Sequence, residues 1–583
     1  MTHSEIEQEL HRRAESFLSQ KHLLVNYNRI YRRVAYPLPV RCFELLKYPM
    51  PEGSDYPWAT WLVFALEERI YSLGWAGEWF GAEAVREAVR RDIIALAEWP
   101  EYRQYKTSPD LCFGHTARIL WTAYKNWKWL DTEVRTGIEA AFRRMVDDAL
   151  PAFEKHFADI HTPQNIFAQP NPSKYFHNIA LIGSVGLSFA AHGVGHLCAE
   201  SVDMRLQMIV ASMLDHRRDG FSEAVGYDGF VMDFLADWMK VLPPEKRDKI
   251  VEHPRFDDLL DESIALAAPG AALDVAELSD VEPIQMPHHA SAHAKLLRLR
   301  PNPFAAWYLS RCKLERLRAD ALAALHAGSS VNTWKTPQAG ALNAHYALVL
   351  RSGWESDDLV VAMGHSSCNM GHIHHDNGSI VVGTGGAWLL ADPGYQQYQP
   401  TPEQEFTLGV TAHNTPIIND QAQTIKAPHN HALKDLGAGL YRADVDLTGC
   451  YAPELRLDQV VRTVWLARND LVVVADRIAG GVVDSIAYHW HGHREAAWWV
   501  KDNVAQLVLP TGGIFVTSPQ ATFTEAQVDR LPGSKGELTL KVTLDSTGPV
   551  IWWIFARMGV KTQPPKVAAH GTTIHVNADV FLV

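Results

Sequence analysis

The chain has 583 residues, too long for one ordinary core, and its length predicts roughly two to four domains. Hydrophobic residues make up 47% and charged residues 21%, which is typical of a soluble globular protein. The formal charge of -13 argues against a general nucleic-acid binder, and no apolar run reaches the ~18 residues of a membrane span, so we expect neither nucleic acid nor a membrane as a partner.

The N-terminal segment gives an expectation about the compartment. Residues 1–7 are acidic and lead directly into an amphipathic pattern, without the basic start and apolar run of a secretory signal. The six cysteines are scattered without CxxC spacing, which fits a reducing environment. We therefore expect a cytoplasmic protein, or a periplasmic one if a leader has been removed.

From the start of the chain to about residue 325, apolar residues recur at helical spacing. In residues 131–150 they fall mostly three or four apart with Arg and Glu between them, and Asp131 can cap the helix start. Similar patterns cover residues 58–73, 82–99, 201–214 and 227–241. Residues 1–330 are therefore predicted to form an all-helical domain.

Two segments of this half carry polar side chains of chemical interest. Glu223 and Tyr227 lie four apart, so on a helix the carboxylate can accept a hydrogen bond from the phenol; a core tyrosine bonded to a glutamate is the alternative. His177 and Asn178 open an apolar helix over residues 179–191, whose positive end suits a carboxylate ligand. Simple capping by Asn178 is the alternative there.

After residues 336–340 the apolar period changes to two. Short runs rich in branched and aromatic residues follow, for example residues 344–350, 471–475 and 550–555. Their spacing predicts packed antiparallel sheets, so residues 336–583 are expected to form a β-sandwich. A helical domain followed by a sheet domain favours a ligand cleft where the two meet.

The densest chemistry lies in residues 372–379, which read His-Ile-His-His-Asp-Asn-Gly-Ser. In an extended segment residues two apart project to one side, so His372, His374 and Asp376 share a face. A solvated strand face with chance histidines is the alternative interpretation.

Two later residues complete a possible metal site. Asp392 ends an apolar strand, where an unpaired carboxylate is costly, and His413 lies in a loop further on. If His374, Asp392 and His413 converge, they supply two nitrogens and one oxygen, ligand types that zinc accepts. His372 would then remain for chemistry beside the metal.

Together these motifs resemble the heparinase II/III-like polysaccharide lyases and their relatives, which include alginate oligosaccharide lyases and uronyl epimerases. The resemblance rests on His-x-His-x-Asp-x-Gly-Ser at 372–379, Asp-Pro-Gly at 392–394 with Tyr398 after it, and His-Asn-Thr at 413–415. The pattern Asp-Gly-x-x-Glu-x-x-x-Tyr at 219–227 agrees with it. The resemblance implies an α+β multidomain protein, with an incomplete (α/α) toroid followed by an antiparallel β-sandwich.

The resemblance also implies a reaction, β-elimination at a uronic acid that gives a 4,5-unsaturated uronate. The sugar carboxylate is neutralised, a base removes the C5 proton and an acid protonates the departing O4. Neutralisation stabilises the developing enolate-like charge, and positioned proton transfer adds ~10²–10⁴-fold. The expected partner is an acidic, uronate-containing oligo- or polysaccharide. The lack of a secretory signal favours exolytic action on oligosaccharides.

The resemblance assigns catalytic roles to four residues. Tyr227 is the expected base and also the acid that protonates O4. His372 and His177 are its partners, either as an alternative base or as donors to the substrate carboxylate. Asn178 is the expected neutralising group.

Further residues match metal and substrate positions of the family. His374, Asp392 and His413 match a zinc site found in some members, which we expect to be structural, and another divalent ion is the alternative. Glu223, Tyr398 and Arg118 are expected to bind substrate, although a salt bridge inside the fold is the alternative for Arg118.

Three other functions compete with the lyase. A uronyl C5-epimerase uses the same proton abstraction without expelling O4. A glycoside hydrolase of the α/α toroid type would need two carboxylates, such as Glu223 and Asp219, and would leave the histidines unexplained. A non-catalytic carbohydrate-binding protein is the third. A homo-oligomer is compatible with all of them.

Overall fold

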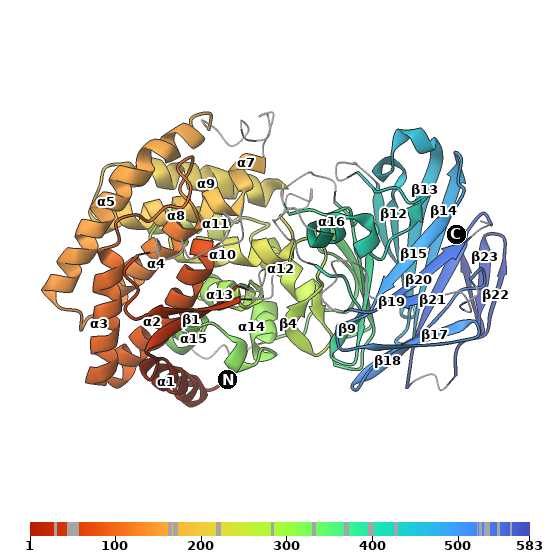
Figure 1. The fold of residues 1–583 in the computed structure, drawn as a ribbon, viewed down its shortest axis with the longest axis horizontal. Coiled ribbons are helices and arrows are strands. Elements are labelled where there is room, and N and C mark those ends of the chain that lie inside the picture. Colours follow the sequence, from red (N-terminus) through yellow and green to blue (C-terminus); the bar gives the residue numbers. More distant parts are fainter. Residues whose placement is uncertain are drawn as a thin grey trace. The chain divides into compact units, whose positions relative to one another are not determined.

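The computed structural model describes residues 1–27, 32–42, 58–160, 166, 173–216, 223–281, 285–328, 334–366, 372–394, 402–424, 430–521, 523, 527–529, 537–544, 548–559 and 563–583. They form two compact units (Figure 1). The first comprises Met1–His216, Asp228–Leu259 and Pro287–Lys335, and the second comprises Arg217–Tyr227, Leu260–Met286 and Thr336–Val583.

The first unit is helical, as predicted. Its helices are α1 (His3–Leu18), α2 (Trp58–Phe80), α3 (Glu83–Ala97), α4 (Leu111–Asn126), α5 (Thr132–His156), α7 (Ser173–Phe176), α8 (Asn178–Gly193), α9 (Cys198–His216), α10 (Val225–Met239), α11 (Pro244–Val251), α12 (Asp258–Ala265), α13 (Met286–Leu296), α14 (Pro303–Ser310) and α15 (Ala319–Ala327). An antiparallel hairpin of β1 (His22–Tyr27) and β2 (Arg32–Pro37) lies among them and was not predicted.

The helices form where the sequence pattern requires them. Asp131 caps α5 because its side chain accepts a hydrogen bond from the backbone N of Val134, at 2.9 Å. Helices α4 and α8 approach closely at glycines: a Cβ on Gly186 would lie 2.7 Å from the Cα of Gly114. The absence of side chains there lets the two backbones pack directly.

Six helices of this unit surround one cavity. Helices α2, α4, α8, α10, α13 and α15 each contribute lining residues to it. A ring of inner helices about a common interior is the arrangement of the predicted incomplete (α/α) toroid.

Two segments predicted to be part of the helical domain belong to the second unit instead. The strands β3 (Ala267–Ala268) and β4 (Ala271–Val275) follow α12 and bond to the sheets. The Arg351 guanidinium donates to the carbonyls of Ala265 and Ala267, and the Trp388 indole N–H donates to the carbonyl of Asp274. These bonds explain why residues 260–286 group with the sheets.

The second unit is built from antiparallel sheets. The five-stranded sheet contains β5 (Gly340–Asn343), β6 (Ala347–Arg351), β7 (Val360–Gly364), β8 (Ile380–Thr384) and β9 (Ala387–Leu390). The eight-stranded sheet has the order β11 (His431–Asp435), β12 (Leu440–Asp446), β13 (Leu457–Ala467), β14 (Leu471–Gly480), β21 (Ile551–Arg557), β18 (Gly512–Thr517), β17 (Val504–Leu509) and β16 (Ala497–Lys501). A four-stranded sheet contains β10 (Ile417–Ile418), β15 (Ile486–His491), β20 (Thr539–Leu544) and β19 (Gln527–Asp529).

The sheets pack as the predicted sandwich, with an additional layer. One face of β14 contributes Val472 and Val474 to the core shared with the five- and four-stranded sheets. The other face contributes Val473 to a second core, closed by a three-stranded sheet of β22 (Val567–His570), β23 (Thr573–Val576) and β24 (Asp579–Leu582). The middle of the eight-stranded sheet is therefore buried on both faces, which explains the unbroken apolar runs of β14 and β21.

Among the helices that the structure describes, none combines the length and the apolar composition that a membrane crossing requires.

Candidate functional site

Tyr227 lies in the first turn of α10, within the second unit. Ala224 has a left-handed backbone with φ of 78°, and the helix begins only after it, at Val225. Glu223 therefore precedes the helix, and the expectation that Glu223 and Tyr227 share one helix face is wrong. One partner of the phenol is another carboxylate, that of Asp280, to which the Tyr227 hydroxyl donates at 3.2 Å.

Asp280 joins Tyr227 to His372. The same carboxylate oxygen, Oδ2, lies 2.8 Å from Nδ1 of His372. The Tyr227 and His372 rings stack, with centroids 3.8 Å apart and planes inclined by 17°. The predicted proximity of these two side chains is found, and a single buried oxygen holds both of them.

The contact with Asp280 bears on which nitrogen of His372 carries a hydrogen. When Asp280 is ionised it only accepts, so Nδ1 of His372 donates to it, and in the neutral tautomer of the ring the lone pair then lies on Nε2. One basic nitrogen and one hydroxyl therefore stand side by side on a common carboxylate. This is the pairing that a general base and a general acid require.

Two backbone loops are bonded together to hold this arrangement. The backbone N of Asp280 donates to the carbonyl of His372 at 2.9 Å, and both the backbone N and the hydroxyl of Ser279 donate to Asp376 at 2.7 Å. Ser279 and His372 have φ values of 60° and 69°, which are costly for residues other than glycine. Such backbone conformations persist because the surrounding hydrogen bonds enforce them.

A second cluster lies close along the chain. Ligand atoms of His374, Asp376 and His413 all lie within 4.8 Å of one another, and all three residues are buried. Neither nitrogen of His374 nor Nε2 of His413 has a hydrogen-bond partner among the described residues. Burial lowers the pKa of His374 to about 4, so its ring is neutral at neutral pH and keeps a lone pair.

Asp392 contacts the cluster through His413. Its Oδ2 lies 2.9 Å from Nδ1 of His413 and accepts from Ser379, and its Oδ1 accepts from the backbone N of Gly394. Burial raises the pKa of Asp392, and His413 opposes this shift. Burial alone would lower the pKa of His413, but the adjacent Asp392 raises it above its ordinary value. The bond directs Nε2 of His413 away from Asp392, as a carboxylate does when it orients a metal-binding imidazole.

Asn414 and Arg462 fix the loops that carry these histidines. The Asn414 amide donates to the carbonyls of Ile380 and Ala391 and accepts from the backbone N of His491. The Arg462 guanidinium donates to the carbonyls of Gly378 and Asn414. The ligand loops are thus anchored to strands on both sides.

Two residues that support the site, Arg462 and Asp280, were not predicted from the sequence. Arg462 faces inward between Val460 and Val464 on an apolar strand, a position where a charge signals a buried partner. Asp280 carries no comparable signal, because it lies 92 residues from His372 and no spacing rule connects them.

The remaining predicted residues have different environments. Arg118 is fully buried and donates to Glu67 and Asp233, so it forms the ion pair inside the fold that was the alternative, and its role in substrate binding stays a prediction. His177 and Asn178 lie in the helical unit, where His177 rather than Asn178 is the N-cap of α8 and Asn178 is buried in its first turn. Tyr398 lies outside the described residues.

Comparisons with known proteins agree with this architecture. Residues 335–552 match the family described as heparinase II/III-like, C-terminal. The chain is similar in structure to heparinase III, with a TM-score of 0.61, 13% sequence identity, and coverage of 92% of this chain and 84% of the other. It is also similar to the heparan sulfate lyase HepC from Pedobacter heparinus, with a TM-score of 0.54, 12% identity and coverage of 98% and 88%. Among curated proteins, no sequence matches this chain.

Proposed function

We propose that this chain, whose residues 335–552 match the heparinase II/III-like C-terminal family, is a member of that superfamily and a polysaccharide lyase that cleaves uronate-containing glycans by β-elimination. The observation that carries the proposal is the meeting of Tyr227 and His372 on one oxygen of Asp280. A phenol and an imidazole held together supply the acid and the base that elimination needs. The similar proteins named heparinase III and heparan sulfate lyase support the same class of reaction.

In the proposed reaction, His372 is the base and Tyr227 is the acid. The His372 Nε2 takes the proton from C5, the C4–O4 bond breaks as the C4–C5 double bond forms, and O4 takes the hydroxyl proton of Tyr227. The geometry supports this division, because an ionised Asp280 accepts from the Tyr227 hydroxyl and from Nδ1 of His372, which leaves the lone pair of a neutral imidazole on Nε2. The cycle closes when His372 loses the proton on Nε2 to solvent and the Tyr227 phenolate takes one from solvent, while Nδ1 keeps its hydrogen bond to Asp280. The assignment of Asn178 as the group that neutralises the substrate carboxylate stays a prediction.

The function is tested by the product. A panel of uronate glycans, namely alginate, heparosan, hyaluronan, chondroitin and glucuronan, is expected to include one that gains ultraviolet absorbance from an unsaturated uronate. A product epimerised at C5 without new absorbance would select the epimerase, and hydrolysis without a double bond would select the glycoside hydrolase. Product sizes over time test the exolytic mode, because early mid-length fragments from a long polymer would contradict it.

We also propose that His374, Asp376 and His413 hold a divalent metal ion, with zinc as the expected ion. Buried imidazole nitrogens without partners among the described residues fit such an ion, since an unpaired buried polar group is otherwise costly. Asp392, which was predicted as a ligand, either orients His413 or joins the set. When bound, the metal supplies a positive charge that pins the loops beside His372.

Metal removal is expected to destabilise the second unit. A tightly bound ion stabilises the folded state by ~3–4 kcal/mol at 100 to 1,000 times its Kd, so chelation is expected to lower the Tm by several degrees. Elemental analysis is expected to find one ion per chain in the wild type and none in His374→Ala or His413→Ala. The matched control, His575→Ala at an exposed position, is expected to keep the ion. A wild-type protein without metal and with a Tm insensitive to chelator would contradict the site.

A further inference from the structure

The interior of the helical unit contains a cavity of about 580 Å³. This volume lies within the range of ~300–1,000 Å³ in which small-molecule sites are found. Its lining comes from α2, α4, α8, α10, α13 and α15 and from residues just beyond the ends of α10 and α13, for example Lys240 and Arg298. Tyr227 lies at the opposite end of α10, in its first turn. The cavity is therefore separate from the proposed proton-transfer centre.

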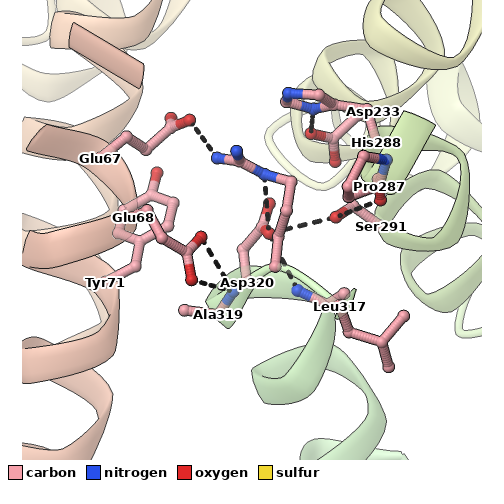
Figure 2. A network of polar contacts seen from close by, with 12 residues as sticks. Glu67, Glu68, Tyr71, Asp233, Pro287, His288, Ser291, Leu317, Ala319 and Asp320 are labelled. Atoms are coloured by element: carbon pink, nitrogen blue, oxygen red, sulfur yellow. Dashed lines mark hydrogen bonds and ion pairs between the residues drawn. The ribbon is translucent and has the colours of Figure 1, made fainter. Parts of the chain in front are cut away.

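The floor of the cavity is a closed network of charges. The Lys295 ammonium donates to Asp233, Asp237 and Asp320 at 2.6, 2.6 and 2.7 Å. Figure 2 shows two of these carboxylates with further partners, Asp233 with His288 and Asp320 with Ser291. The three aspartates have the spacing of a metal site, but the lysine already supplies their cation. The three aspartates are therefore already neutralised without a metal ion.

The mouth of the cavity, in contrast, has an excess of positive charge. Lys125, Lys240 and Arg298 line it, and no salt bridge between described residues uses Lys125 or Arg298. Lys240 bonds to Asp237 at 2.8 Å, a carboxylate that it shares with Lys295. Burial lowers the pKa of Lys240, Asp237 opposes this, and the charges of Lys295 and Arg298 lower it further. An anion placed here would relieve this crowding of like charges.

Aromatic side chains complete the lining. Tyr71, Trp75 and Trp121 border the cavity, and the Lys125 ammonium lies 4.6 Å from the centre of the Trp121 ring. The buried indole N–H of Trp75 has no acceptor among the described residues. Aromatic faces with convergent polar groups suit a sugar ring, whose C–H faces are apolar and whose edges carry hydroxyl groups.

We propose that this cavity is a second binding site, which takes an acidic monosaccharide or the acidic end residue of an oligosaccharide. The carboxylate would lie between Lys240 and Arg298, with the ring against the aromatic lining. The choice of a sugar acid rests on the proposed function, whereas the need for an anion rests on the cations of the mouth alone. Because the cavity lies at the other end of α10 from Tyr227, a ligand bound there would take no part in the elimination.

Calorimetric titration of the full-length chain tests the proposal. Glucuronate is titrated into Tyr227→Phe protein, with glucose and inorganic sulfate as comparison probes. The double variant Lys240→Ala/Arg298→Ala is expected to weaken glucuronate binding at least tenfold at one site, and Trp121→Leu is expected to weaken it in the same direction. Glucose is expected to bind at least tenfold more weakly than glucuronate.

The matched control variant also removes two positive charges, but at positions outside the cavity. Lys155→Ala/Lys249→Ala changes two exposed lysines on α5 and α11 and is expected to leave the titration unchanged. Unchanged glucuronate binding in the Lys240/Arg298 variant would overturn the site, and equal affinity for sulfate would overturn its saccharide specificity. Binding at the proton-transfer centre would be insensitive to these variants. If the chain proved not to be a lyase, the titration would still show whether glucuronate binds in the cavity. The lyase proposal and the binding-site proposal can therefore be rejected independently.

Discussion

Tyr227→Phe is expected to lower kcat for uronate elimination by ~10²–10⁴-fold, the usual contribution of a positioned acid or base. The substitution removes one oxygen, the one that donates to Asp280 at 3.2 Å, and it keeps the ring that stacks on His372. The fold is therefore expected to remain intact while the proton for O4 is lost. The initial rate of absorbance increase from the unsaturated product measures the effect.

The choice of substrate can distinguish the role of the general acid from that of the general base. A uronate with fluoride at C4 needs little protonation of its leaving group, so Tyr227→Phe is expected to slow its elimination much less than that of a glycan. His372→Gln is expected to slow both substrates, because C5 deprotonation is common to them. Tyr124→Phe is the matched control, since its phenol also donates to a carboxylate, that of Glu139, away from the site. Equal losses for both substrates in Tyr227→Phe would instead make Tyr227 the base.

Arg462→Met is expected to destabilise the second unit by ~3–5 kcal/mol, the cost of leaving one member of a buried ion pair uncompensated. The guanidinium is fully buried and bonds to Asp476 through two nitrogens at 2.7 Å. Its third nitrogen holds the carbonyls of Gly378 and Asn414, next to the loops of His374 and His413. Urea-induced unfolding measures the free energy, and elemental analysis is expected to show weaker metal retention.

Two further variants test whether the loss of stability in Arg462→Met comes from the unpaired buried charge. Arg442→Met removes a partly exposed arginine that pairs with Asp444 on the same strand, β12, and it is expected to cost less than ~1 kcal/mol. Arg462→Met combined with Asp476→Asn is expected to recover part of the lost stability, because no buried charge is left alone. A loss below 1 kcal/mol in the single Arg462 variant would show that the loops do not depend on this ion pair.

Much of the architecture could be predicted because periodicity reflects burial. The helical spacing in residues 131–150 corresponds to α5, and the period of two after residue 340 corresponds to the sheets. The third layer could not be predicted from period, since strands buried on both faces, such as β14, show no alternation. The hairpin of β1 and β2 was missed because it is an isolated pair of strands between helices.

The candidate site could be predicted only where its chemistry is local in sequence. The spacing of His372, His374 and Asp376 indicated a site, and the motif at His413 belongs to the same cluster. Asp280 could not be found, because its role depends on a loop that the fold brings to His372. The ion pairs of Arg118 could not be predicted, because an isolated basic residue in sequence does not reveal buried carboxylates such as Glu67.

The burial of β14 and β21 on both faces limits how this protein can change over evolutionary time. Residues Leu471 to Asp476 are all buried, as are Ile551 to Ala556, so neither strand has a side on which polar or larger residues are freely accepted. Substitutions there must conserve volume or be matched by changes in two cores at once. These two strands are therefore where distant homologues should remain easiest to align, even after the surrounding loops have diverged.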